Sequence, residues 1–308
     1  MQLSIVTTLY HSSEYINEFY EKISKEAQKL TNEYEIIFVD DGSPDDSLEK
    51  AIILHKKDTR VKVIELSRNF GHHKAMMTGL THAKGKQIFL IDSDLEEDPK
   101  WLSSFSQQMI KEKCDVVYGV QKVRKGGLFE QWSGILYYKI LNWLLNIEHP
   151  RNITTARLMT KAYVDALLLY KEREMVISGL WILTGFKQHS QIVNKMSTSE
   201  TTYSLGHRLS HFVNTITSFS SKPLISIFFT GITIFSISLC YALYLIANRL
   251  FLSIPLYGWT SIMVSVWLLG GITISFIGVI GIYLSKVFTE TKQRPYIIIK
   301  DIYGEEKD

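Results

Sequence analysis

The stretch QIFLIDSDLEEDP, residues 87–99, changes from an apolar run to a cluster of acids within a few positions. Residues 88–91 have the composition of a buried strand, so Asp92 and Asp94 are expected to emerge at its carboxyl end. Crowded carboxylates repel one another, and a divalent cation between them and a phosphate-bearing ligand would relieve that repulsion. An acidic turn capping a helix near Pro99 would have the same spacing, because a D-x-D pattern alone is a weak motif.

Strand patterns alternate with helix patterns on both sides of this stretch. Apolar runs at Leu3–Leu9, 34–39 and Val61–Leu66 precede it, and a further run covers 115–120. Apolar residues at helical spacing follow the first run from Ile16 to Leu30. Strands that alternate with helices predict an α/β fold with a mostly parallel sheet.

Polar side chains follow several of these strands. In open α/β sheets ligands bind beyond the carboxyl ends of the strands. The side chains that fall there are Tyr10, Asp40, Asp41, Arg68, Asp92 and Asp94. Their convergence favours a metal and nucleotide site over a solvated turn. Aspartate oxygens suit Mg²⁺ or Mn²⁺ better than zinc, and the turn from Arg68 to Gly71 offers a cation and a glycine to a phosphate.

Charge and cysteine usage narrow the class of protein. The 308-residue chain has a formal net charge of +3, which is too small to predict nucleic-acid binding. Cys114 and Cys240 lie in runs that make a disulfide between them implausible, which fits a reducing compartment. The first ten residues, MQLSIVTTLY, have the pattern of a strand rather than of a signal peptide, so the soluble part is expected in the cytoplasm.

Almost all uninterrupted apolar sequence lies after Pro223. Residues 224–247 contain no charge and residues 259–284 form a second apolar run, and each is long enough to cross a hydrocarbon core of roughly 30 Å. Glycines in the second run would permit close helix contact. Lys222 before the first run and Lys286, Lys292 and Arg294 after the second predict that both ends of this transmembrane hairpin face the cytoplasm.

Two further stretches have the mixture of aromatic, basic and apolar residues that interfacial helices carry. They cover residues 128–147 and 204–222. Residues 128–147 could also form a core helix of a soluble domain, but their position in the chain near a membrane segment favours an interfacial helix. The expected organisation is a cytoplasmic catalytic domain over 1–203, an interfacial helix over 204–222, two spans within 223–285 and a cytoplasmic tail over 286–308.

Five blocks of the chain resemble the polyprenyl-phosphate glycosyltransferases of glycosyltransferase family 2, in their order and at their spacing. The blocks are VDDGSPDDS, LSRNFGHHKAMMTGL, DSDLEEDP, RLMTKAYVDAL and GIYLSKVFTETKQRPYII. The family includes dolichyl-phosphate mannose synthase and bactoprenol glucosyltransferases. The resemblance implies a GT-A (Rossmann-like) fold, a nucleotide-diphosphate sugar donor with UDP as the expected nucleotide, Mg²⁺ or Mn²⁺ at the D-x-D aspartates, and undecaprenyl or another polyprenyl phosphate as acceptor.

The resemblance also implies roles for single residues. The nucleotide sugar would be bound by Tyr10, Asp40, Asp41, Arg68 and Asp92, and the metal by Asp92 and Asp94. Arg124 and Ser133 would meet the acceptor phosphate, while Asp94 and Arg157 would act in catalysis. The chain departs from the family pattern at Thr8, Thr155 and Met196, and Thr155 stands where an aspartate, a proposed catalytic base, often stands.

A general base is not strictly required for transfer to a phosphate. A phosphate monoester with a second pKa near ~6 is largely ionised at neutral pH and can attack the anomeric carbon directly, with inversion. We therefore expect an inverting hexosyl- or N-acetylhexosaminyltransferase in the inner (cytoplasmic) membrane that supplies a lipid-linked sugar for cell-envelope glycan modification. The alternative is a catalytically silent membrane adaptor that binds a flippase or another glycosyltransferase. A homo-oligomer is left open.

Overall fold

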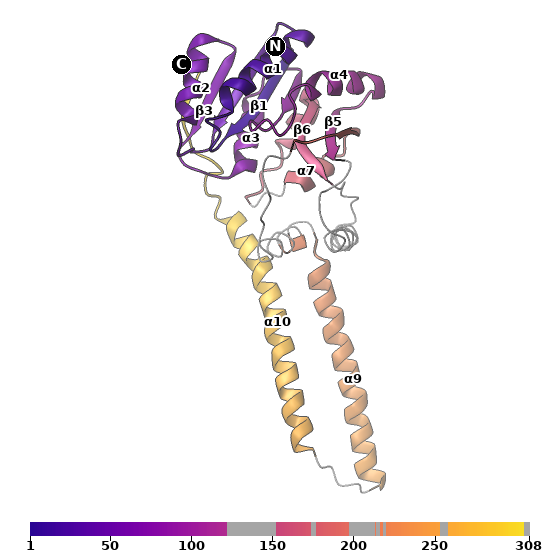
Figure 1. Ribbon diagram of the computed structural model, residues 1–308. Helices are drawn as coiled ribbons and strands as arrows, with labels where there is room; N and C mark the ends of the chain where they lie inside the picture. The colour runs from indigo at the N-terminus through magenta and orange to yellow at the C-terminus, as the bar shows by residue number, and fades with distance from the viewer. Residues whose placement is uncertain are drawn as a thin grey trace. The chain divides into compact units, whose positions relative to one another are not determined.

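The computed structural model describes residues 1–121, 152–173, 177–196, 213, 216–217, 220–252 and 258–304. The chain divides into two compact units, one made of 1–203 with 294–308 and the other of 204–293. The first contains the predicted α/β domain, and the second contains the predicted apolar hairpin (Figure 1). The stretch 128–147, Arg124, Ser133 and most of 204–222 lie outside the described residues.

The described part of the first unit is built on an eight-stranded sheet with the order β7-β5-β6-β4-β1-β2-β3-β8. The strands are β1 Leu3–Leu9, β2 Tyr34–Asp40, β3 Val61–Leu66, β4 Gln87–Leu90, β5 Val116–Gln121, β6 Ile153–Thr160, β7 Gln188–Val193 and β8 Ile299–Tyr303. Strands β4, β1, β2 and β3 are parallel neighbours, whereas β6 and β8 run antiparallel to theirs. The predicted α/β fold with a mostly parallel sheet is confirmed.

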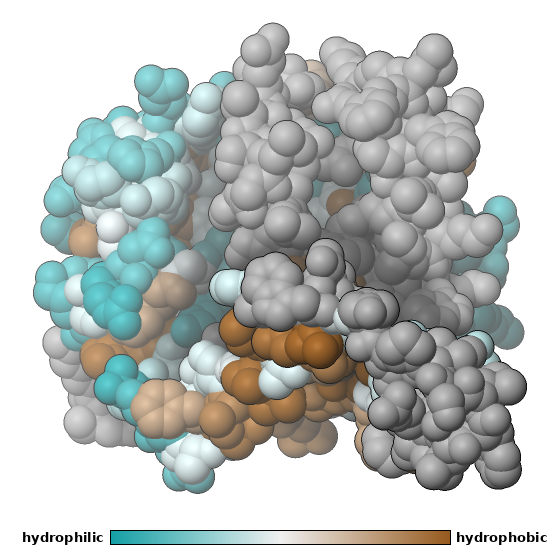
Figure 2. Space-filling view, turned by 90° about the horizontal axis from the view of Figure 1, so that it is seen from below, coloured by the Kyte–Doolittle hydropathy of each residue, from teal (hydrophilic) through white to brown (hydrophobic). Residues whose placement is uncertain are grey.

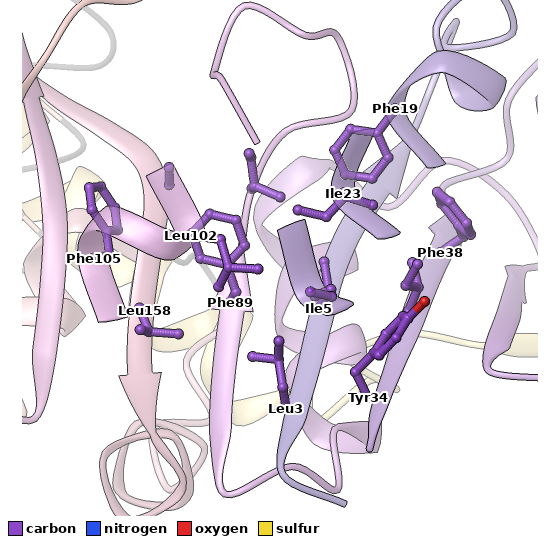
Figure 3. Packing of buried hydrophobic residues seen from close by; sticks show 14 of the residues in the cluster. Leu3, Ile5, Phe19, Ile23, Tyr34, Phe38, Phe89, Leu102, Phe105 and Leu158 are labelled. Atoms are coloured by element: carbon purple, nitrogen blue, oxygen red, sulfur yellow. The ribbon is translucent and has the colours of Figure 1, made fainter. Parts of the chain in front are cut away.

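Helices cover both faces of this sheet. They are α1 Ile16–Leu30, α2 Ser47–Lys57, α3 His72–His82, α4 Trp101–Glu112, α6 Lys161–Leu167 and α7 Ile177–Leu183. Helices α1, α2 and α4 share one hydrophobic core with the sheet, where Phe19 meets Phe38 and Phe105 meets Phe89 edge to face (Figure 3). Helix α3 packs on the other face, because its Gly79 lies against Val6 and Val39, whose side chains alternate with those of the core.

The C-terminal segment differs from the predicted tail, because 294–308 belong to the first unit. Strand β8 pairs antiparallel with β3 and is the yellow strand beside it in Figure 1. Lys300 and Tyr303 both bond the carboxylate of Glu65. The sequence pattern missed β8 because a short strand with two charged residues looks like exposed tail.

The second unit contains α9 Lys222–Leu252 and α10 Trp259–Thr291. Within them, Lys222–Tyr241 and Ser265–Thr291 are long and apolar enough to be candidate membrane spans, and their side chains are not buried inside the protein. Figure 2 shows hydrophobic residues (brown) gathered on this hairpin. A Cβ added at Gly270, Gly271, Gly278 or Gly281 would meet nothing within 4 Å among the described residues, so the expected close helix contact at these glycines is not made there.

Asp58 joins the start of β3 to helix α1. Its carboxylate accepts hydrogen bonds from Arg60 Nε (2.9 Å) and Nη2 (2.8 Å) and from Tyr20 Oη (2.7 Å). The bonds from Arg60 outweigh burial and lower the pKa of Asp58 to about 2. Ionised Asp58 therefore stabilises the fold.

We expect Asp58→Asn to reduce the free energy of unfolding at pH 7 by about 1–2 kcal/mol. Because the folded-state pKa lies below the ordinary value of 3.8, the stabilisation is present above that value and is lost as the pH falls toward the folded pKa. The melting temperatures of variant and wild type in detergent should thus converge between about pH 4 and pH 2. A melting temperature at pH 7 equal to that of the wild type would contradict this role.

Candidate active site

The strands bring the predicted aspartates to one edge of the sheet. Asp40 ends β2 beside Leu9, the last residue of β1, and the amide of Asp41 donates to the Leu9 carbonyl (3.0 Å). Strand β4 is parallel to β1, so Asp92 and Asp94 follow at the same edge. His72 acts electrostatically on both Asp41 and Asp92, which links the two acidic segments.

Asp92 is surrounded by groups from three other elements. His72 at the start of α3 has its Nε2 3.3 Å from Asp92 Oδ1, and its Nδ1 lies 2.9 Å from Thr8 Oγ1. The side chain of Thr155 on β6 also helps to lower the pKa of Asp92. Burial disfavours the ionised carboxylate, but the bond and charge of His72 outweigh it, so the pKa of Asp92 is lowered. Asp92 is therefore held in place and ionised.

Asp94 and Glu96 lie in a tight turn next to a lysine. The Glu96 amide donates to Asp94 Oδ1 (3.0 Å), with Leu95 between them at a φ of 58°. Burial, followed by the charge of Asp92, raises the pKa of Asp94. Lys195, two residues beyond the end of β7, pairs with Glu96 (2.9 Å). Burial disfavours its charge, but Glu96, Glu97 and Asp92 together raise its pKa.

Glu97 is a second, deeper acid of this site. Its side chain is fully enclosed, and its Oε1 accepts the Thr155 amide (2.9 Å). Its Oε2 has no hydrogen-bond partner among the described residues. Burial and the charge of Asp92 raise the pKa of Glu97 to about 8.

Asp40 and Asp41 form the other half of the edge, and both are buried. Asp41 accepts the amides of Phe70 (2.7 Å) and Gly71 (3.0 Å). Asp40 Oδ2 accepts the Ser43 amide (3.3 Å), whereas its Oδ1 has no partner among the described residues. Burial, reinforced by the charges of Glu65 and Asp41, raises the pKa of Asp40 to about 6. A buried, unpaired acceptor of this kind is suited to a donor group on a ligand.

Tyr10 and Arg68 lie at the surface near these acids. Tyr10 is 49% exposed and meets the ring of His11 edge to face. Arg68 donates to the Asn69 carbonyl (3.0 Å) and lies 4.1 Å over the ring of Phe70. Both remain predicted ligand contacts.

Arg157 lies inside the domain, only 1% exposed. It donates to the carbonyls of Thr154 and Thr155 (both 3.2 Å), and its guanidinium lies over the ring of Trp181. Burial lowers the pKa of Arg157 to about 9. Glu97 acts on Arg157 electrostatically, so the structure shows this arginine as a buried neighbour of the acidic site. Its predicted contact with a phosphate stays a prediction.

Asp92 and Asp94 fit a divalent metal in their chemistry. The charge of Asp92 raises the pKa of Asp94, so the pair carries a repulsion that a cation would relieve. Carboxylate oxygens are the donors that Mg²⁺ and Mn²⁺ prefer. Within the described ranges, no group of three or more His, Cys, Asp or Glu residues has metal-holding geometry.

An acidic edge at the carboxyl ends of a mostly parallel sheet is a common place for a ligand site, and comparison with known proteins identifies the family. Residues 4–168 match the model of glycosyl transferase family 2, so the chain belongs to that family and is a glycosyltransferase. A relative in Mycobacterium tuberculosis (strain CDC 1551 / Oshkosh), named only as a glycosyltransferase, is 51% identical over 99% of this chain and 89% of its own. A prophage bactoprenol glucosyl transferase homolog of Escherichia coli (strain K12) is 30% identical, and the match covers 98% of this chain and 99% of that relative.

Among solved structures, glucosyl-3-phosphoglycerate synthase from Mycobacterium tuberculosis is similar with a TM-score of 0.48. The two chains are 18% identical, and the match covers 71% of this chain and 80% of that one.

Three site residues were not predicted from the sequence: His72, Glu97 and Lys195. Glu97 belongs to the same acidic run as Asp92, and that run was the available signal. His72 lies at the start of α3, and only the packing of that helix reveals its contact with Asp92. Lys195 follows β7, a strand without a clear apolar pattern.

Gly42 allows the turn after β2 to touch the loop 67–71. Its φ is +64°, and a Cβ there would lie 2.6 Å from backbone atoms of Arg68 and Asn69. We expect Gly42→Ala to push these loops apart, weaken the amide bonds to Asp41, and lower both transfer activity and melting temperature. Gly185→Ala is the matched control, because its φ is +73° and its Cβ would meet only an atom at 3.9 Å. Equal losses in the two variants would show that backbone strain alone, and not the loop contact, matters.

Proposed function

We propose that this glycosyltransferase moves one sugar from a UDP-linked donor to a polyprenyl phosphate at the cytoplasmic membrane face. The observation that carries the proposal is the convergence of Asp92, Asp94 and Lys195 at the carboxyl edge of a domain followed by two candidate membrane spans. The relatives named bactoprenol glucosyl transferases match almost the whole chain, hairpin included, which supports a lipid acceptor.

The nucleoside half of the donor would bind at Asp40 and Asp41. Uracil carries an N–H group that can donate to the buried, unpaired Oδ1 of Asp40. Tyr10 and Arg68, both exposed, would contact the ring and the phosphates.

Asp92 and Asp94 would hold Mg²⁺ or Mn²⁺, which when bound supplies positive charge against the departing nucleoside diphosphate. His72 and Thr155 orient the Asp92 carboxylate, and the turn at Leu95 orients Asp94. Lys195, which is paired with Glu96, adds a positive charge that acts on Asp94. Lys195 would stabilise negative charge where it develops on the departing diphosphate, beside the charge of the metal that the two aspartates would hold, which is a large contribution to catalysis.

The acceptor phosphate needs no protein base, since it is largely ionised at neutral pH. Moving an isoprenoid chain into water would cost about 0.8 kcal/mol per methylene, so the site must meet the lipid at the membrane. Arg124, Ser133 and Arg157 remain the proposed acceptor contacts, of which the first two lie outside the described residues. Flippase and homo-oligomeric partners are compatible with this scheme.

Strand β8 supports the proposed topology. It follows the hairpin in the chain yet pairs with β3, which precedes the hairpin. One sheet cannot lie on two sides of a membrane, so the chain between them must cross it an even number of times. Two crossings, with the catalytic unit and the C-terminus in the cytoplasm, satisfy this condition.

The decisive experiment incubates membranes containing the protein with radiolabelled UDP-glucose or UDP-N-acetylglucosamine and undecaprenyl phosphate, followed by lipid extraction. Label in the lipid phase that depends on added undecaprenyl phosphate supports the proposal and identifies the sugar. Lipid label absent with every nucleotide sugar tested would favour the adaptor alternative.

We expect Asp94→Asn to reduce transfer by orders of magnitude, because the variant loses a carboxylate oxygen that would bind the metal. Folding and membrane insertion should be retained, as the half-buried Asp94 side chain accepts a hydrogen bond from the Glu96 amide within its own turn. Excess chelator should inhibit the wild type, and added Mn²⁺ should restore it. Full activity of the variant, or of the wild type in chelator, would remove the metal from the mechanism.

The topology can be tested with a reporter fused after Asp308. We expect a cytoplasmic reporter signal, because β8 joins the end of the chain to the catalytic sheet. A periplasmic signal at this position would overturn the two-span arrangement.

A further inference from the structure

The segment that follows helix α10 contacts the nucleotide half of the site at three points. Residues 296–303 belong to the same compact unit as β1 and β2, and β8 forms most of this segment. Each of the three contacts involves a segment that contains Asp40 or His72, pairs with the strand of Asp40, or donates hydrogen bonds to Asp41.

The first contact supports the loop under Asp41. The Ser67 amide donates to the Ile298 carbonyl (2.9 Å), which fixes the start of the loop 67–71. The far end of the same loop donates its two amides to Asp41. The turn at Gly42 packs against the middle of the loop. The loop is thus held between the Gly42 turn and the C-terminal segment.

The second contact balances a charge beside Asp40. Glu65 lies opposite Asp40 in the register of β2 and β3, and its charge acts on Asp40. Glu65 is only 8% exposed and is paired by Lys300 and by Tyr303 Oη (3.2 Å), both from β8. Strand β8 thereby supplies the counter-charge of the acid nearest to the proposed nucleoside contact.

The third contact is at the first turn of α3. The Lys74 ammonium lies 5.5 Å from the ring centroid of Tyr296. His72, which contacts Asp92, is in the same turn. Tyr296 therefore packs beside the helix end that carries the link between the two acidic segments.

We propose that residues 296–303 are a positioning element of the donor-nucleotide site, in which Tyr296 and Ile298 support the 67–74 segment and Lys300 neutralises Glu65 next to Asp40. This inference rests on the proposed function. Residues 296–303, which follow the second candidate span in the chain, would then be a structural part of the donor site.

The test of the electrostatic part is a double-mutant cycle on Glu65 and Lys300. Lys300→Met leaves Glu65 with one partner, and its charge then disfavours the ionised Asp40 that would accept from uracil. Calorimetric titration of the full-length protein in detergent with UDP and Mn²⁺ should give a Kd raised about 2-fold to 5-fold, the range of an exposed ion pair. Glu65→Gln/Lys300→Met should bind UDP like Glu65→Gln alone, because the unpaired charge is gone.

Lys111→Met is the matched control, since it removes a lysine from the exposed last turn of α4. Its UDP affinity should equal that of the wild type. Tyr296→Ala tests the loop support and should raise the Kd for UDP and the KM for the sugar donor, with the KM for undecaprenyl phosphate unchanged. Tyr296→Phe keeps the ring and should restore both values.

The outcomes separate this inference from the proposed function. A wild type that binds neither UDP nor GDP would defeat the proposed donor site and the inference with it. A wild type that binds UDP, with the same Kd in Lys300→Met and Tyr296→Ala, would overturn the inference alone. Equal changes in donor and acceptor KM together with a lower melting temperature would also overturn it, because they indicate general destabilisation.

Discussion

The concentration of carboxylates at one sheet edge is the constraint that shapes this domain. Two carboxylates about 4 Å apart at an effective dielectric constant near 20 repel by about 4 kcal/mol, which is a large part of a domain's net stability. For three of these acids the repulsion is reduced by a partner from a different element. Asp41 takes the amides of the 70–71 turn, Asp92 takes His72, and Glu97 takes the Thr155 amide. The same contacts therefore hold the loops in place and prepare the site for cationic ligands.

The parts of this arrangement that depend on local pattern could be predicted from the sequence. Strands β1 to β4 are short apolar runs, and parallel strands separated by helices place their carboxyl ends together, so the positions of Asp40 and Asp92 followed. Lys195 could not be found this way, because it reaches the acids only through the pairing of β7 with β5. The contact of Lys300 with Glu65 joins residues 235 positions apart, and no short-range pattern contains it.

The apolar hairpin is a different case. Its two helices were predicted from length and composition, which suffice when the bilayer supplies the apolar surroundings. The glycines of α10 were expected to mark contact with α9, but they face open space among the described residues. The positions of glycines in a helix show where a second helix could approach closely. Which helix does so can be learned only from the packing.

The substitution at Thr155 is consistent with the charges around it and does not require a loss of activity. Its amide bonds Glu97 and its side chain acts on Asp92, so an aspartate at this position would place a third carboxylate between two others. Glu97, fully buried and without a partner for its Oε2, already supplies an acid at this depth. A neutral threonine beside Asp92 helps to lower the pKa of that carboxylate, after the larger effect of His72. Because the proposed phosphate acceptor would be ionised and need no base, a hydrogen-bond donor in place of an acid at 155 would cost the proposed reaction little.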